Sequence, residues 1–232
     1  MTHTHTHTEK LRVLEYRLGV RQQTCNSLTF LESGIPPMKA LIMSKQWKYF
    51  KRVRATPAYL NSPLHFAINL AISNQTPMGS YLKKLFDLNE DPLQAAMDNI
   101  QNTVNGLNST RATIYKTVNP SLKPHYLYEN TGILESYRIY TTRLRLSSHY
   151  LRIETGRWSR IDRSQRKCNC GVIQDEERIL CHYHFTCDLR NEVSSLNFYN
   201  LSSLFDSRDS IALCEYAHKA LHRIYNVHQI HH

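Results

Sequence analysis

Residues 93–118 read LQAAMDNIQNTVNGLNSTRATIYKTV, and their pattern indicates the fold class. Asp91 and Pro92 precede it as a helix cap and a first helical residue. Gly106 and Asn108 weaken the middle, so the stretch forms one long helix or two shorter ones. Its apolar residues recur at the three- and four-residue spacing of one helix face: Ala96, Met97, Ile100, Val104 and Leu107.

The rest of the chain shows the same helical pattern on both sides of this stretch. Polar capping residues and prolines stand where helices begin, and strand signals are few. We therefore predict an all-α fold, a multi-helix bundle with an irregular arginine-rich loop at residues 156–172. The other predicted helices cover residues 9–20, 24–31, 37–53, 63–72, 77–88 and 133–146, then one after Asp175 and a last one after Asp206 or Asp209. The predicted core stripe of the last helix is Ile211, Cys214, Leu221 and Ile224.

Three regions of different composition divide the chain. Residues 1–10 contain an alternating Thr-His run that resembles a translated CA repeat. The run has no apolar side chain to bury, so we expect a disordered leader there. Residues 11–130 form a helical connecting region, and residues 131–228 hold an arginine-rich helix, a knuckle-like loop and the C-terminal helices.

The formal charge of +10 is concentrated in two segments. Residues 39–54 carry six basic residues and no acidic one, and residues 138–167 carry nine basic residues against Glu154 and Asp162. Two concentrated patches on a near-neutral body favour a polyanionic partner, RNA or DNA. The alternative for each patch is a solvated helix face.

The compartment follows from the apolar runs and the cysteines. The longest apolar run, Leu64 to Ile72, is too short to span a bilayer, and no secretory segment follows Met1. We expect no membrane partner and an intracellular location, nuclear or cytoplasmic. The six cysteines are then expected to be thiols or metal ligands rather than disulfides.

The second basic segment runs directly into a close cysteine pair, Cys168 and Cys170. Arginine presents forked donors that match phosphate, and a metal-held loop would fix them in register. The indole of Trp158 either stacks on an unpaired base or pins the loop to the core. The candidate nucleic-acid-binding residues are Arg143, Arg145, Arg152, Arg157, Trp158, Arg160, Arg163, Arg166 and Lys167.

Two motifs carry a family resemblance. Residues 151–160 read LRIETGRWSR, followed by CNCGVIQDEE at residues 168–177. Upstream, LESGIPP at residues 31–37 precedes the basic segment at residues 47–51. In order and spacing these motifs resemble the C-terminal, post-polymerase region of LINE-type (non-LTR) retrotransposon reverse transcriptases. The similarity covers most of residues 13–196.

The resemblance implies that the polymerase itself lies upstream of this region. That polymerase needs paired aspartates for two-metal nucleotidyl transfer, and this chain has no Asp-Asp pair and no glycine-rich phosphate loop. Four acidic residues resemble a metal-nuclease cluster in composition, but each lies among arginines or at a helix start, where pairing and capping explain it: Glu154, Asp162, Glu176 and Glu177. We expect the chain not to be an enzyme.

The resemblance also implies a zinc knuckle that begins with Cys168 and Cys170. The expected histidine and final cysteine fall at Arg178 and Tyr183, and neither residue can replace the lost ligand. Substitutes follow closely: Cys181, His182, His184 and Cys187. Either the knuckle is degenerate and free of metal, or zinc is bound by Cys168, Cys170, Cys181 and His184.

The leading hypothesis is a non-catalytic fragment of a retroelement reverse transcriptase that binds nucleic acid, RNA in particular, through residues 138–167. Further cations would extend the track of phosphate contacts: Lys48, Lys51, Arg52 and Arg54. A rival from another class is a helical protein-interaction module with an apolar groove over residues 64–107. A third reading is a non-functional retroelement relic, which the Thr-His run and the broken knuckle suit.

Overall fold

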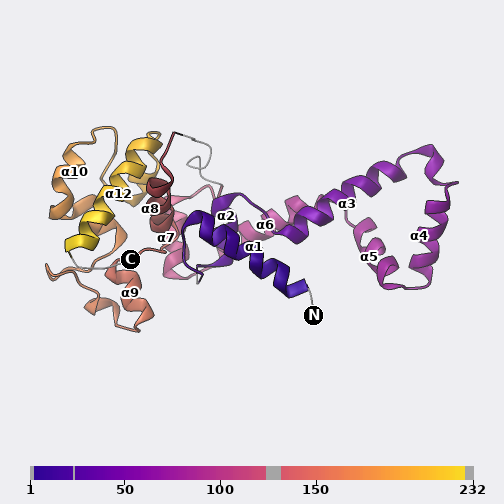
Figure 1. Cartoon of the computed structure of the whole chain (residues 1–232), viewed down its shortest axis with the longest axis horizontal. Coiled ribbons are helices and arrows are strands. Elements are labelled where there is room, and N and C mark those ends of the chain that lie inside the picture. The colour runs from indigo at the N-terminus through magenta and orange to yellow at the C-terminus, as the bar shows by residue number, and fades with distance from the viewer. Residues whose placement is uncertain (1–2, 23, 124–131, 228–232) are drawn as a thin grey trace. The chain divides into compact units, whose positions relative to one another are not determined.

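All regular secondary structure in the described residues is helical (Figure 1). The computed structural model describes residues 3–22, 24–123 and 132–227, with side chains from residue 11 onward. Within these ranges the only strand-like pairing is one antiparallel bridge between Lys167 and Ile173. The predicted all-α, multi-helix fold is confirmed.

The chain divides into two compact units. The first contains residues 35–103 together with residues 1–7, and the second contains residues 8–34 and 104–232. This division differs from the expected boundary near residue 130. The reason is that the segment before residue 35 packs with the C-terminal region, which lies far away in the sequence.

The first unit is built around a helical hairpin. Ser62 and Thr76 cap its two helices, their hydroxyl oxygens accepting the N–H groups of His65 (3.1 Å) and Gly79 (3.0 Å). Gly79 permits a close crossing, since a Cβ there would lie 1.9 Å from the carbonyl oxygen of Ala71. The elements are α3 (Met38–Arg54), η1 (Pro57–Tyr59), α4 (Pro63–Ser73), α5 (Pro77–Phe86) and most of α6 (Pro92–Gly106).

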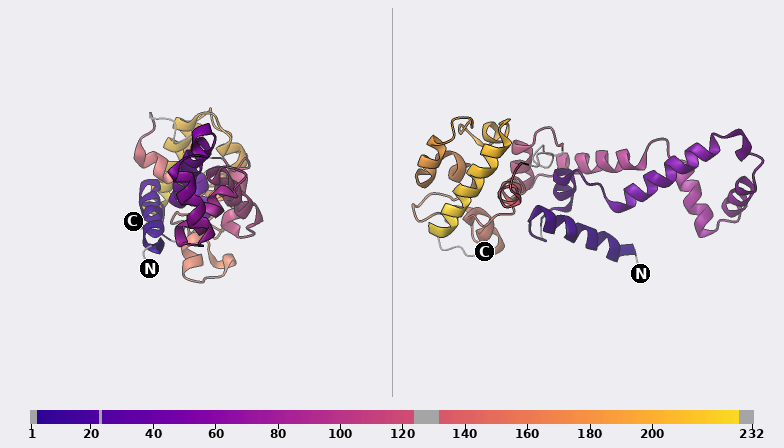
Figure 2. Two further views of the ribbon diagram at one scale, coloured as in Figure 1. Left: turned by 90° about the vertical axis from the view of Figure 1, so that its right-hand side faces the viewer. Right: turned by 45° about the horizontal axis from the view of Figure 1, so that its top comes forward.

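The second unit contains the larger core. Its long C-terminal helix α12 packs against α8, as Figures 1 and 2 show. Asp209 caps α12 by accepting the N–H of Ala212 (3.0 Å). The helices are most of α1 (His3–Leu18), then α2 (Asn26–Ser33), α7 (Thr110–Val118), α8 (Glu135–Arg145), α9 (Arg152–Trp158), α10 (Cys187–Asn191), α11 (Leu201–Phe205) and α12 (Ser210–Val227). Short turns complete it: η3 (Arg163–Gln165), the π-helical η4 (Arg178–His182) and η5 (His184–Thr186).

Two sequence expectations differ from the observed helices. Helix α1 begins at His3 and so includes the Thr-His run for which we expected disorder. Extending an existing helix costs far less than nucleating one, and the apolar residues after residue 10 supply the nucleus. In α12 the predicted core residue Ile211 is half exposed, whereas Cys214 and Leu221 are fully buried.

The stretch 93–118 forms two helices, α6 and α7, rather than one. The break falls at Leu107 to Ser109, directly after the weak Gly106 position. Ser109 starts α7 because its hydroxyl oxygen accepts the N–H of Ala112 (3.2 Å).

None of the described helices is both long enough and apolar enough to cross a bilayer.

Candidate nucleic-acid interface

The cations of the arginine-rich segment 138–167 differ in exposure, some being buried and others exposed. Arg145 is fully buried and forms a bidentate ion pair with Glu32, with Nε–Oε1 at 2.6 Å and a terminal nitrogen–Oε2 distance of 3.0 Å. Its other terminal nitrogen donates to the carbonyl oxygen of Val118 (3.0 Å). The prediction that Arg145 contacts phosphate is therefore wrong, because its guanidinium is held inside the core.

Two further arginines in the predicted set bind the protein itself. The Nε of Arg143 donates to the carbonyl oxygen of Gly19 (2.6 Å) and so ties α8 to the end of α1. Arg157 forms an ion pair with the buried carboxylate of Glu154 at 2.6 Å. Burial lowers the pKa of Arg157, and the nearby guanidinium of Arg111 lowers it further against the attraction of Glu154. These two side chains stay partly exposed, and each has one donor bound by the protein.

Arg166 holds the loop that follows α9. Its guanidinium donates to the carbonyl oxygens of Ile161 (2.7 and 2.9 Å) and Ile153 (3.0 Å). The side chain lies over Gly156, where a Cβ would meet the Arg166 Cγ at 2.6 Å. Any larger residue at position 156 would displace the Arg166 side chain, so the glycine allows Arg166 to reach the carbonyl oxygens that it binds.

Gln174 fastens the other side of the same loop. Its side-chain oxygen accepts the N–H of Arg152 (2.8 Å), and its own N–H donates to the carbonyl oxygen of Arg166 (3.0 Å). The carbonyl oxygen of Gln174 accepts the N–H of Ile153 (3.1 Å). The irregular loop predicted at residues 156–172 begins later than expected, because residues 156–158 complete α9. The remaining residues are irregular apart from the short turn η3, and their backbone is fixed from both ends.

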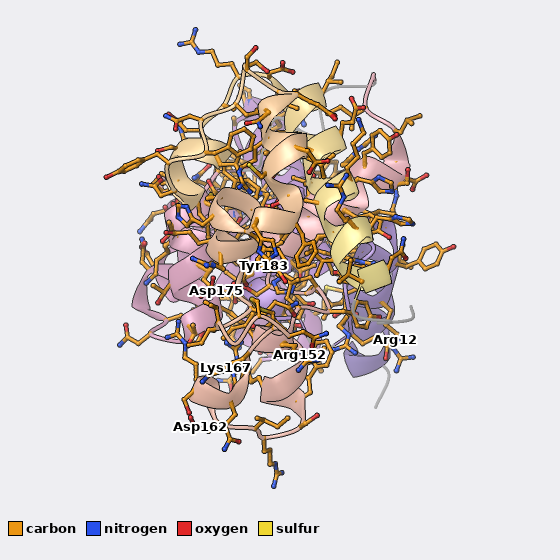
Figure 3. All side chains as sticks on the ribbon, turned by 90° about the vertical axis from the view of Figure 1, so that its left-hand side faces the viewer. Arg12, Arg152, Asp162, Lys167, Asp175 and Tyr183 are labelled. Carbon is orange, nitrogen blue, oxygen red and sulfur yellow. A yellow bond between two sulfur atoms is a disulfide. The ribbon has the colours of Figure 1, made fainter. Side chains whose placement is uncertain are left out.

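Four predicted cations remain exposed on this fixed loop and at the start of α9: Arg152, Arg160, Arg163 and Lys167. Figure 3 shows Arg152 and Lys167 at the same end of the second unit, formed by α9 and the loop after it. The single carboxylate between residues 155 and 174 is Asp162. Hydrogen bonds from Ser164 to Asp162 lower the pKa of that carboxyl, so it is an anion engaged by its own turn.

Arg160 has a left-handed backbone, with φ +55°. The N–H of Arg160 donates to the carbonyl oxygen of Arg157 (3.2 Å), and that of Ile161 to Gly156 (2.8 Å). This pairing is the Schellman end of a helix, in which the left-handed position is usually glycine. An arginine there costs backbone free energy, and strain of this kind is common at functional sites.

Trp158 is held by neighbours within the unit. The guanidinium carbon of Arg21 lies 3.3 Å from the centroid of the indole, and the ring of Tyr150 meets it edge-on at 5.9 Å. Of the two readings for Trp158, this packing favours the one in which the ring pins the loop, because side chains from two other segments, Arg21 and Tyr150, already pack on the indole.

Sequence reasoning missed two cations of this region, Arg21 and Arg111. Arg111 donates through Nε (2.9 Å) and a terminal nitrogen (2.7 Å) to the Glu154 carboxylate, which it shares with Arg157. Arg21 and Arg111 also line one small cavity beside Trp158. Both lie far from α9 in sequence and outside any basic run, so no local signal marks them.

The four predicted zinc ligands are not gathered in one cluster of the described residues. Cys168 and Cys170 form a disulfide, which corrects the expectation that all cysteines are thiols or ligands. Burial raises the pKa of the Cys181 thiol to about 12. His184 is exposed on η5. In the part of the chain that the structure describes, no three metal-binding side chains lie close enough to share an ion.

The acidic residues near α9 have structural partners. Glu154 is completely buried between Arg111 and Arg157. Glu176 accepts hydrogen bonds from His149 Nε2 (2.8 Å) and the Ser147 hydroxyl (3.1 Å). Burial opposes ionisation of Glu176, but His149 and these hydrogen bonds together lower its pKa. Pairing thus explains both carboxylates.

Comparisons of the chain with protein-family models, with curated proteins and with solved structures give no match, so the resemblance to LINE-type reverse transcriptases stays a prediction.

Proposed function

We propose that the chain is a non-catalytic fragment of a retroelement reverse transcriptase that binds nucleic acid, RNA in particular, through the loop after α9. The exposed cations named above would contact phosphates, and Arg166, whose guanidinium bonds to backbone carbonyl oxygens, would hold the loop rather than the ligand. Charge on a rigid loop is favourable for binding, since little side-chain and backbone freedom is lost on association.

The observation that carries this proposal is that some residues of the arginine-rich region hold the loop in place while others are exposed on it. Arg166 and Gln174 fix the loop backbone. Arg160, Arg163 and Lys167 project from the loop and form no ion pair with a carboxylate among the described residues. A solvated helix face, the alternative for this patch, would not need an arginine in the left-handed position of a Schellman turn.

The test is a titration of the chain into a labelled RNA hairpin, followed by fluorescence anisotropy over a series of salt concentrations. Replacement of Arg160, Arg163 and Lys167 together by alanine should weaken binding. The slope of log K against log salt should become less steep by about 2, at about 0.7 for each lost single-strand phosphate contact. A DNA hairpin of the same sequence measures the preference for RNA.

A matched control removes the same charge elsewhere. Lys83, Lys84 and Lys123 are exposed and lie outside the loop, so their joint replacement by alanine tests net charge alone. The proposal is wrong if the two triple variants lose the same affinity and slope. Circular dichroism of each variant checks that the helices are retained.

The helical interaction module stays a second candidate because of one observation on the first unit. Large apolar side chains around the hairpin are exposed, with Phe66 at 71% and Met78 at 63% of their full area. The first partner to test is a second copy of the chain. Replacement of Phe66 and Met78 by serine should abolish any self-association in sedimentation velocity without changing the RNA salt slope.

A further inference from the structure

The first unit contains a pocket lined by aromatic rings and cations. It encloses about 450 Å³, and the residues that matter here are Trp47, Phe50, Lys51, Arg54, Phe86 and Asn89. Four of them recur on one face of α3 at the helical intervals of three and four residues, and α5 and the segment after it supply the other two. The volume lies in the range typical of small-molecule sites.

The rings that line this pocket are fixed before any ligand arrives. The Nε1–H of Trp47 donates to the carbonyl oxygen of Leu88 (3.3 Å), which holds the indole against the end of α5. Phe50 and Phe86 meet edge-to-face, with centroids 5.5 Å apart. Rigid rings make good stacking surfaces, because no rotamer freedom is lost when a planar ligand binds.

Two cations lie over these rings rather than beside an acid. The Lys51 ammonium is 4.5 Å from the centroid of Trp47, and the guanidinium carbon of Arg54 is 4.6 Å from that of Phe86. Among the described residues neither cation forms an ion pair with a carboxylate. By contrast, Lys48 on the same helix is neutralised by Asp91 at 2.7 Å.

We propose that this pocket binds an unpaired nucleotide of a single-stranded nucleic acid. The base would stack on Trp47 or Phe86, the phosphate would meet Lys51 and Arg54, and the Asn89 amide offers hydrogen bonds to a base edge. The shared chemistry is a planar base joined to a phosphate, so a free nucleotide is the other possible source. This site lies within the first unit and does not depend on the loop after α9.

The test uses the full chain labelled with 5-fluorotryptophan. The chain has two tryptophans, so ¹⁹F NMR gives one signal for Trp47 and one for Trp158, assigned with Trp47→Phe. Addition of an eight-residue oligoadenylate should shift the Trp47 signal in a saturable way. An abasic oligomer of the same length, with phosphates but no bases, should shift it much less.

A pair of variants separates the pocket from general charge. Arg54 lines the pocket and Arg52 does not, although both are exposed on the same turn of α3. Arg54→Gln should weaken the titration of the Trp47 signal about fivefold, whereas Arg52→Gln should change it less than twofold.

The outcomes distinguish this inference from the proposed function. A Trp47 signal that does not move, equal shifts with the abasic oligomer, or equal effects of the two arginine variants would each overturn it, even when RNA binding through the α9 loop holds. A titration with adenosine monophosphate distinguishes a free nucleotide from a nucleic-acid strand as the ligand. A shift at concentrations near those needed for the oligomer assigns the pocket to a free nucleotide, and a far weaker response assigns it to a strand.

Discussion

The guanidinium of Arg145 and the carboxylate of Glu32 form a buried, bidentate ion pair across 113 residues of sequence. The Tyr115 hydroxyl donates to the same carboxylate (3.1 Å), and Asn119 donates to that hydroxyl (2.9 Å). The pair therefore joins α2, α7 and α8 in the core of the second unit.

Arg145→Met should destabilise the chain by about 3–5 kcal/mol, because it leaves the Glu32 carboxylate buried without its counter-ion. The double variant Arg145→Met/Glu32→Leu should lose less than Arg145→Met alone, since no isolated charge is left. Urea unfolding measures both. A double variant that is less stable than the single one would show that the pair itself, and not charge burial, determines the cost.

Arg160→Gly should raise the free energy of unfolding by about 1 kcal/mol, because glycine adopts the left-handed conformation without steric cost. The same change should weaken RNA binding, since a phosphate contact is removed. Replacement of a residue with only a structural role rarely raises the stability of the chain and weakens RNA binding at the same time. Arg163→Gly serves as the control, because position 163 has no left-handed backbone and should gain no stability.

Glu154→Gln should destabilise the second unit by about 2 kcal/mol, less than a fully buried pair, because Arg111 and Arg157 are partly exposed. It should also tighten RNA binding at low salt by adding one net positive charge beside the loop. Thermal unfolding and the anisotropy titration measure the two effects. An unchanged melting temperature would contradict the central place assigned to this carboxylate.

Asp91 should contribute a pH-dependent stability to the first unit. Hydrogen bonds from Lys48 and Ser44 and from the Leu93 N–H lower its pKa from 3.8 to about 2. A lowered pKa in the folded state means that the contribution is fully present above about pH 4 and disappears as the pH falls towards 2. The difference in stability between the unaltered chain and Lys48→Met should therefore be constant from pH 7 to 5 and shrink below pH 4. Thermal unfolding at each pH gives this difference.

Cysteine alkylation should follow burial. Cys187 is exposed, whereas Cys181 is buried with a pKa raised to about 12, so its thiol stays protonated at neutral pH. Brief treatment of the folded chain with iodoacetamide should modify Cys187 and leave Cys181 intact by mass spectrometry. Equal labelling of the two would restore Cys181 as a candidate zinc ligand.

Local signals predicted most helices of this chain but only part of its candidate site. Ser62-Pro63 and Thr76-Pro77 mark the starts of α4 and α5 correctly, because a cap and a first-turn proline act within four residues. The basic character of residues 138–167 is equally a property of the sequence. The roles within that segment are not, since Arg143 and Arg145, only two positions apart, differ in burial and partners.

The all-α class, the caps and the two basic segments can be read from the sequence, because all of them depend on neighbours along the chain. Which cations are exposed to contact phosphate depends on the folded structure. Glu32 reaches Arg145, Arg111 reaches Glu154, and Arg21 covers Trp158, each from a distant segment. Burial and ion pairing depend on which distant segments come into contact on folding, and a local pattern of residues does not specify those contacts.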